Sequence, residues 1–311
     1  MATFTARDLN MGIEKGQLKE LYDTAPHIHA LAILANWMII FGTAYMTSMF
    51  FNPFTYVLAV LIIGARMHAL AILMHDATHF RFLKNRKLSD LVTNLFCMYP
   101  LFSSLDKYRP NHLKHHQHLN TEDDPDWFVK IGRKEFTFPK SKQEFLITVF
   151  SYFTLVKGFM DAIWFLKRFN IVSSKKPQPF TKKLPKIAFY IAAAIIFSVL
   201  GIWKEFALYW VIPYFSTFFM FQYIRSVAEH FGELEYDHLL TSTRTIKLSW
   251  VEKFFLAPHN VGYHLEHHLY PGVPFYHLPA LHKLLMSQPE YQEKAHVTHG
   301  FWKGLMNELG K

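Results

Sequence analysis

Long apolar runs set the strongest limit on how this chain can fold. Residues 30–50 carry no charged side chain, and further apolar runs cover 54–74, 185–203 and 206–224. A helix needs about 20 mostly apolar residues to cross a bilayer core. The four runs therefore predict an all-α integral membrane protein with four transmembrane helices. The alternative is a large soluble protein with buried core helices. Such a protein would have to bury many of the 31 Phe side chains, an unusually high number for a chain of this size.

Short connections join these runs in pairs. Asn52 and Pro53, a turn signal, follow the first run. Only Lys204 and Glu205 interrupt the last two runs. We therefore expect two hairpins, each of which returns the chain to the side from which it entered.

Two other apolar segments are not typical of a membrane span. Residues 91–102 are too few and contain Pro100, and residues 145–167 carry Lys157 and Asp161. We expect both segments to be interfacial or re-entrant rather than to cross the bilayer.

The distribution of charge indicates the orientation. The net charge is +9, and Lys and Arg gather beside the apolar runs, in 81–87 and 175–186. This positive-inside pattern, together with a polar N-terminal stretch unlike a secretory signal, predicts cytoplasmic termini. No motif interleaves aromatic and basic residues, so we expect no nucleic-acid partner. The single cysteine, Cys97, excludes an intramolecular disulfide and a cysteine-rich metal site.

Histidine clusters are the second unusual feature of the sequence. One is an i, i+4 pair in the motif HDATH, and two are H-x-x-H-H triples, whose spacing places the imidazoles on one side of a helix. The eight histidines are His75, His79, His112, His115, His116, His264, His267 and His268. A ninth candidate, His230, follows the fourth run. Eight imidazoles are about twice the number that one ion can bind while it keeps a coordination position open. We therefore predict two metal ions with three or four nitrogens each.

A shared metal site requires all three clusters to lie on one face of the membrane. Two hairpins satisfy this requirement, because they leave residues 75–144 and 225–311 on the cytoplasmic side. We therefore predict a single domain, residues 1–311, in which interfacial helices and a helical cytoplasmic cap accompany the four spans.

Charged residues beside the clusters are candidates for orienting the metal-binding rings. These candidates are Asp76, Arg225, Glu229, Glu266 and the acidic run 122–126. A solvated loop is the alternative for the acidic run, and a membrane anchor is the alternative for Arg225.

The remaining polar residues give weaker signals. His29 and His282 are interpreted as ordinary cap or surface residues, and His68 as a neutral, hydrogen-bonded histidine within the second span. Arg66 lies inside the same span and needs a polar partner there, which the sequence does not identify.

Two other metal-dependent functions fit the sequence less well. HDATH differs from the zinc-protease motif H-E-x-x-H because Asp76 replaces the glutamate that acts as the base. A metal transporter or sensor is expected to carry coordinating polar groups within its spans, and residues 30–50 offer no ionisable group.

With these clusters in place, residues 30–285 resemble the membrane-bound fatty acid desaturase and hydroxylase superfamily. Its pattern is H-x(3 or 4)-H followed by two copies of H-x(2 or 3)-H-H around two hairpins. The resemblance implies a non-haem di-iron oxidoreductase that uses dioxygen, with the eight motif histidines as iron ligands. His230 would match an additional histidine found after the fourth span in some members.

The resemblance also implies a lipid substrate. Fatty acyl desaturation is our first expectation. The alternatives are a hydroxylase, ketolase or oxidative decarboxylase of an alkyl, fatty acid or carotenoid lipid. The short first motif is similar to that of bacterial acyl-lipid desaturases, which implies a bacterial inner membrane. The sequence has no His-Pro-Gly-Gly haem motif, so we expect electrons from a separate ferredoxin-like or cytochrome b5-like carrier.

Overall fold

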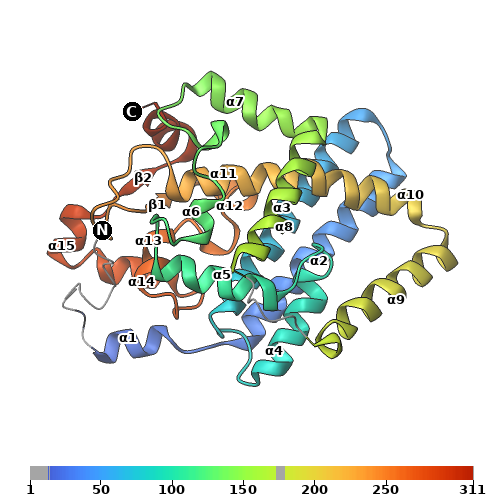
Figure 1. Cartoon of the computed structure of the whole chain (residues 1–311), viewed down its shortest axis with the longest axis horizontal. Helices are drawn as coiled ribbons and strands as arrows, with labels where there is room; N and C mark the ends of the chain where they lie inside the picture. Colours follow the sequence, from blue (N-terminus) through green and yellow to red (C-terminus); the bar gives the residue numbers. More distant parts are fainter. Residues whose placement is uncertain (1–12, 14, 173–178, 311) are drawn as a thin grey trace.

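The computed structural model describes residues 13, 15–172 and 179–310, and nearly all of its regular structure is helical (Figure 1). This confirms the predicted helical class. The described strands, β1 Thr245–Lys247 and β2 Val297–His299, form one small parallel sheet in which Ile246 pairs with Thr298.

The first predicted hairpin consists of α2 Pro26–Met49 and α3 Pro53–Thr78. Asn52 caps α3: its side chain accepts a hydrogen bond from the Thr55 amide, and its own amide donates to the Thr55 hydroxyl. Pro53 occupies the first turn, where its missing N–H is not needed. Both helices are long and apolar enough to cross a membrane.

The second hairpin is less regular than its sequence suggests. Helix α9 Leu184–Leu200 ends at Gly201, which adopts a positive φ of 66°. The return path is helical but is interrupted by two π-helical segments, which Pro213 helps to separate. Proline lacks an amide hydrogen and disturbs the regular ladder of hydrogen bonds. The elements of this return path are α10 Trp203–Phe206, η5 Ala207–Val211, η6 Tyr214–Phe218 and α11 Phe219–His230.

The segment 145–167 does not form one straight helix. Helix α7 Lys142–Ser151 and the short η3 Tyr152–Thr154 precede α8 Val156–Val172, and the chain bends by 92° between them. Leu155, at the bend, has a φ of 65°. The two arms are apolar enough for a span only when they are taken together.

Shorter helices complete the fold. They are α1 Lys15–Leu21, α4 Arg86–Thr93, α5 Leu105–Gln117, α6 Pro125–Phe128, α12 Trp250–Phe255, α13 His264–Leu269, α14 Leu278–Leu285, α15 Pro289–Lys294 and α16 Met306–Glu308. The remaining 3-10 and π segments are η1 Asn94–Met98, η2 Lys134–Phe136, η4 Phe180–Lys182, η7 Pro258–Asn260 and η8 Phe301–Leu305.

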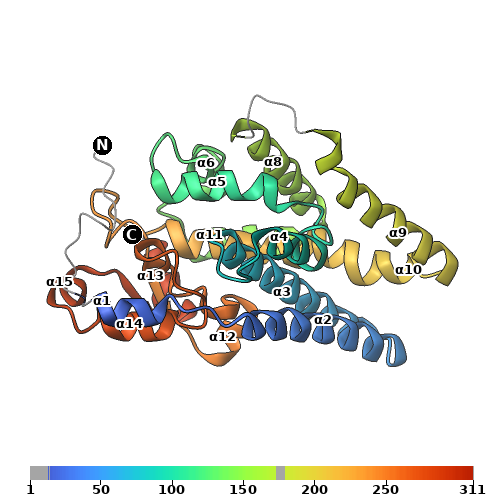
Figure 2. The ribbon, with the colours of Figure 1, turned by 90° about the horizontal axis from the view of Figure 1, so that it is seen from below.

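Helix α3 forms the centre of the packed core. Every residue of α3 from Ile63 to Thr78 is buried, and the helix contacts α2, η6 and α11. Gly64 allows the closest approach, because a Cβ atom there would lie 2.0 Å from the hydroxyl of Thr217. Figure 2 shows the turns of both hairpins at one end of the molecule, with α13 and α14 at the other.

Candidate metal centre

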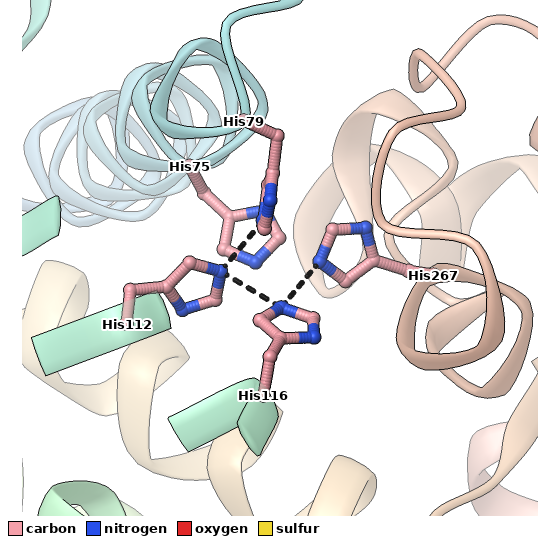
Figure 3. Close-up of side chains that lie close together, drawn as sticks. All are labelled: His75, His79, His112, His116 and His267. Carbon is pink, nitrogen blue, oxygen red and sulfur yellow. Dashed lines mark hydrogen bonds between the residues drawn. The ribbon is translucent and has the colours of Figure 1, made fainter. Parts of the chain in front are cut away.

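Five histidines from three helices converge at the end of α3. His75 lies in α3 and His79 is the C-cap residue just after it; His112 and His116 come from α5, and His267 from α13 (Figure 3). One nitrogen of each lies within 4.8 Å of one nitrogen of every other. We call these residues the five-histidine group.

The four-histidine group lies beside it. His115 of α5 and His230 at the end of α11 meet His264 and His268 of α13, again with nitrogens within 4.8 Å of one another. Rings of the two groups also touch, since the centroids of His116 and His268 are 4.3 Å apart.

The H-x-x-H-H spacing distributes histidines to both groups. In α5 the outer pair, His112 and His116, joins the five-histidine group, and the middle histidine joins the other group. In α13 the outer pair, His264 and His268, joins the four-histidine group, and the middle histidine again crosses over. Positions i+3 and i+4 on a helix are about 100° apart, so one triple can reach two centres. The structure thus brings together all nine predicted histidines, in groups of five and four rather than three or four.

Burial favours the neutral form of eight of these nine rings. Seven of the nine are at most 7% exposed, and His79 and His116 are half-buried. Burial, and then the neighbouring imidazoles, lower the pKa of His112, His264 and His267 well below the usual value. A neutral imidazole has the lone pair that a metal needs.

The spacing of the nitrogens fits a transition-metal ion. Successive Nε2 atoms are 2.9 to 3.1 Å apart along both groups. Two nitrogens bound at right angles, each roughly 2.1 Å from an ion, would be about 3.0 Å apart. Imidazole suits Fe, Zn, Cu and Ni alike, so the donor set fits a metal pair without selecting the element.

Asp124 orients one ring directly. Its Oδ2 lies 2.8 Å from Nδ1 of His115, which leaves Nε2 of that ring free to face the four-histidine group. The carboxylate is fully buried and also accepts the Asn120 amide at 3.0 Å. Burial alone would raise the pKa of Asp124, but His115 and the Asn120 amide outweigh burial and lower it. Within the acidic run, Glu122 and Asp123 are exposed, as expected of a solvated loop.

Arg225 and Glu229 support a second ring. Nε of Arg225 lies 2.6 Å from Oε1 of Glu229, and the same oxygen lies 3.4 Å from Nδ1 of His264. Arg225 therefore holds the carboxylate that faces His264.

The other two orienting candidates make different contacts. Asp76 accepts the Phe275 amide at 3.1 Å and lies 3.4 Å from Nδ1 of His29. Glu266 is fully buried on the opposite side of α13, where His282 and the Tyr291 hydroxyl, the latter at 2.6 Å, contact it. Both carboxylates hold segments around the third histidine motif.

His29 and His282, interpreted as ordinary cap or surface residues, are not at the surface, because the structure buries both. His29 stacks on Phe82 with centroids 4.3 Å apart, and His282 contacts Glu266. The partners are far away in sequence, so spacing could not reveal them.

Arg66 has the polar partners that its position requires. It donates to Oδ1 of Asn36 at 3.3 Å and to the backbone carbonyl of Phe254, and its guanidinium lies 3.8 Å from the Phe254 ring centroid. Asn36 also contacts Nε2 of His259 at 3.0 Å. This cluster links the first hairpin to the segment that precedes α13.

Comparison with known proteins decides the family. The sequence model of the family described as fatty acid desaturase matches residues 51–300. The chain belongs to this fatty acid desaturase family. The predicted resemblance and enzyme class are thereby confirmed: the chain is a desaturase-type oxidoreductase of a membrane family.

Three curated relatives illustrate the range of similarity. The desaturase is 33% identical over 260 residues to dihydrorhizobitoxine desaturase of Bradyrhizobium elkanii, covering 80% of this chain and 72% of that protein. It is 23% identical to sn-1 oleoyl-lipid 12-desaturase of Anabaena variabilis, covering 78% and 71%. It is also 24% identical to human sphingolipid delta(4)-desaturase/C4-monooxygenase DES2, covering 78% and 68%.

A cavity of about 170 Å³ lies beside both histidine groups of the desaturase. His75 and His112 line it from one group, and His115, His230 and His264 from the other. Apolar side chains form one wall, among them Met74, Met98, Leu101, Phe218 and Phe219. Charged residues also line the cavity. This arrangement can hold a partly apolar molecule against the converging nitrogens.

Proposed function

We propose that this desaturase holds two iron ions, one in each histidine group, and removes two hydrogens from adjacent carbons of a fatty acyl substrate. In each turnover one dioxygen, two electrons and two protons would be consumed, and an alkene and two waters would be released. The two iron ions would supply the activation of dioxygen. The observation that carries the proposal is the convergence of nine mostly buried imidazoles into two groups beside one cavity.

The protein's own residues would position the reacting groups and exclude water. Asp124 would fix the ring of His115 so that its Nε2 keeps one direction, and the Glu229 carboxylate lies 3.4 Å from Nδ1 of His264. The apolar wall, including Met74 and Phe218, would keep bulk water from the reacting carbons.

We further propose that α2, α3, α9 and the path from α10 through α11 are four membrane spans in one domain, residues 1–311. Both termini and the cap segments 75–144 and 225–311 would lie in the cytoplasm. The common location of the two hairpin turns, opposite α13, supports this arrangement.

Electrons would come from a separate ferredoxin-like or cytochrome b5-like carrier. The basic clusters in 81–87 and 175–186 support docking of an acidic partner beside the apolar runs, because complementary charge speeds association.

Lipid analysis tests the reaction. Lipids from cells that express the desaturase should contain species that have lost two hydrogens relative to a His267→Ala strain, and this difference should require oxygen. Identical lipid profiles in the two strains, with both proteins folded in the membrane, would refute the proposed reaction.

Hydroxylation is the second candidate. The name of the human relative joins a desaturase and a monooxygenase, and both outcomes begin with removal of one hydrogen. Products that gain one oxygen, with no alkene, would favour hydroxylation.

A further inference from the structure

The lining of the cavity contains three cations, of which two are well paired. Arg225 lies 2.6 Å from Glu229, and Arg133 contacts Asp161. The third cation, Lys130, lines the same cavity. The two guanidinium groups are thus already neutralised by carboxylates of the protein.

Lys130 is held more loosely. Its Nζ is 3.8 Å from Oδ2 of Asp126, which is beyond hydrogen-bond length. Among the described residues, no atom accepts a hydrogen bond from this Nζ. The side chain is 15% exposed, and burial lowers the pKa of Lys130 to about 8 although Asp124 and Glu229 act to raise it. An ammonium group has three donors, so this Nζ can donate to a further acceptor in the cavity.

We propose that Lys130 binds an anionic headgroup of the substrate, a carboxylate, inside the catalytic cavity. This inference rests on the proposed function, because it assigns one end of the molecule that the histidine groups oxidise. A monoanion fits better than a dianionic phosphate, since the carboxylates of Asp126, Asp161 and Glu229 line the same cavity.

Lys130 lines the same cavity as histidines of both groups. The carboxylate and the carbons to be oxidised would therefore occupy one cavity.

Matched six-carbon probes test the headgroup site. Hexanoate, hexyl phosphate and 1-hexanol share a chain and differ in charge, and calorimetry on the purified, metal-loaded protein would measure their dissociation constants. Hexanoate should bind about tenfold more tightly than hexanol, the ratio that one charge-assisted hydrogen bond supplies, and more tightly than hexyl phosphate.

Variants identify the residue responsible. Lys130→Met should remove the preference for hexanoate and Lys130→Arg should retain it. Lys294→Met should leave it unchanged, because Lys294 is exposed and pairs with Glu290 on α15. If Lys130→Met does not fold, Lys130→Gln takes its place. The affinities of the unmodified protein for the three probes still test whether the cavity prefers a carboxylate.

The outcomes separate this inference from the proposed function. Equal binding of hexanoate and hexanol, stronger binding of hexyl phosphate, or an unchanged preference in Lys130→Met would overturn the headgroup site. Metal content and reductant-dependent oxygen uptake, measured on the same preparations, report on the oxidation itself. Their loss with an intact hexanoate preference would refute the proposed function and not the anion site.

Discussion

At the scale of single residues, the hydrogen bond from His115 to Asp124 shows how the metal centre is prepared for its ions. A buried imidazole can present either nitrogen, and the carboxylate at 2.8 Å selects which one faces the group. The sequence predicted that some acid in 122–126 could do this. It could not identify which, because burial of Asp124 and exposure of Asp123 depend on how α5 and α6 pack.

Replacing Asp124 with Asn tests this role. The amide keeps the size but loses the charge that holds the His115 tautomer, so we expect metal affinity to fall about 10- to 100-fold. Competition with a chelator would measure the fall. Asp123→Asn is the matched control, since the Asp123 side chain is 75% exposed. Equal affinities of the two variants would show that Asp124 does not orient the ring.

At the scale of elements, the histidine motifs combine predictable and unpredictable features. The i, i+4 pairs follow from helix geometry, and all nine histidines were identified from the sequence. Their division into groups of five and four depends on how α5 and α13 face each other. Likewise, Asn52 and Pro53 predicted the first hairpin, whereas the π segments on either side of Pro213, which contact α3, were not predicted.

The crossing of α3 with η6 gives a stability prediction. In Gly64→Ala the new methyl group would meet the Thr217 hydroxyl, which donates to the Val60 carbonyl at 2.6 Å. We expect this overpacking to lower the free energy of unfolding by about 1–3 kcal/mol. Denaturant titration in detergent would measure it.

Gly42→Ala on α2 is the matched control. A Cβ atom there meets nothing within 4 Å, so the change should be neutral or raise the free energy of unfolding by up to about 1 kcal/mol. Equal destabilisation by the two substitutions would contradict the close α3–η6 packing as its cause.

At the scale of the whole molecule, two hairpins would hold the histidine-bearing segments on one side of the membrane. Helices α2 and α3 are long and apolar enough to be spans. The second hairpin is harder to recognise, because α9 is short and its return path is broken into several helical segments.

Cysteine labelling tests the arrangement in the membrane. The natural Cys97 is buried, so we expect the maleimide to react mainly with the introduced cysteines. In intact cells, an impermeant maleimide should label Phe51→Cys and Lys204→Cys at the two hairpin turns, and should label Lys294→Cys only after permeabilisation. Labelling of the first turn but not the second would mean that only one hairpin crosses the bilayer.

The metal content of the purified protein tests the central claim most directly. Element analysis should find about two irons per unmodified chain. It should find about one in His264→Ala or His267→Ala, because each substitution removes a ligand from a different group. His299→Ala, at an exposed histidine of β2, should retain two. A single metal per unmodified chain, or two metals that remain in both ligand variants, would contradict a two-metal centre built from these histidines.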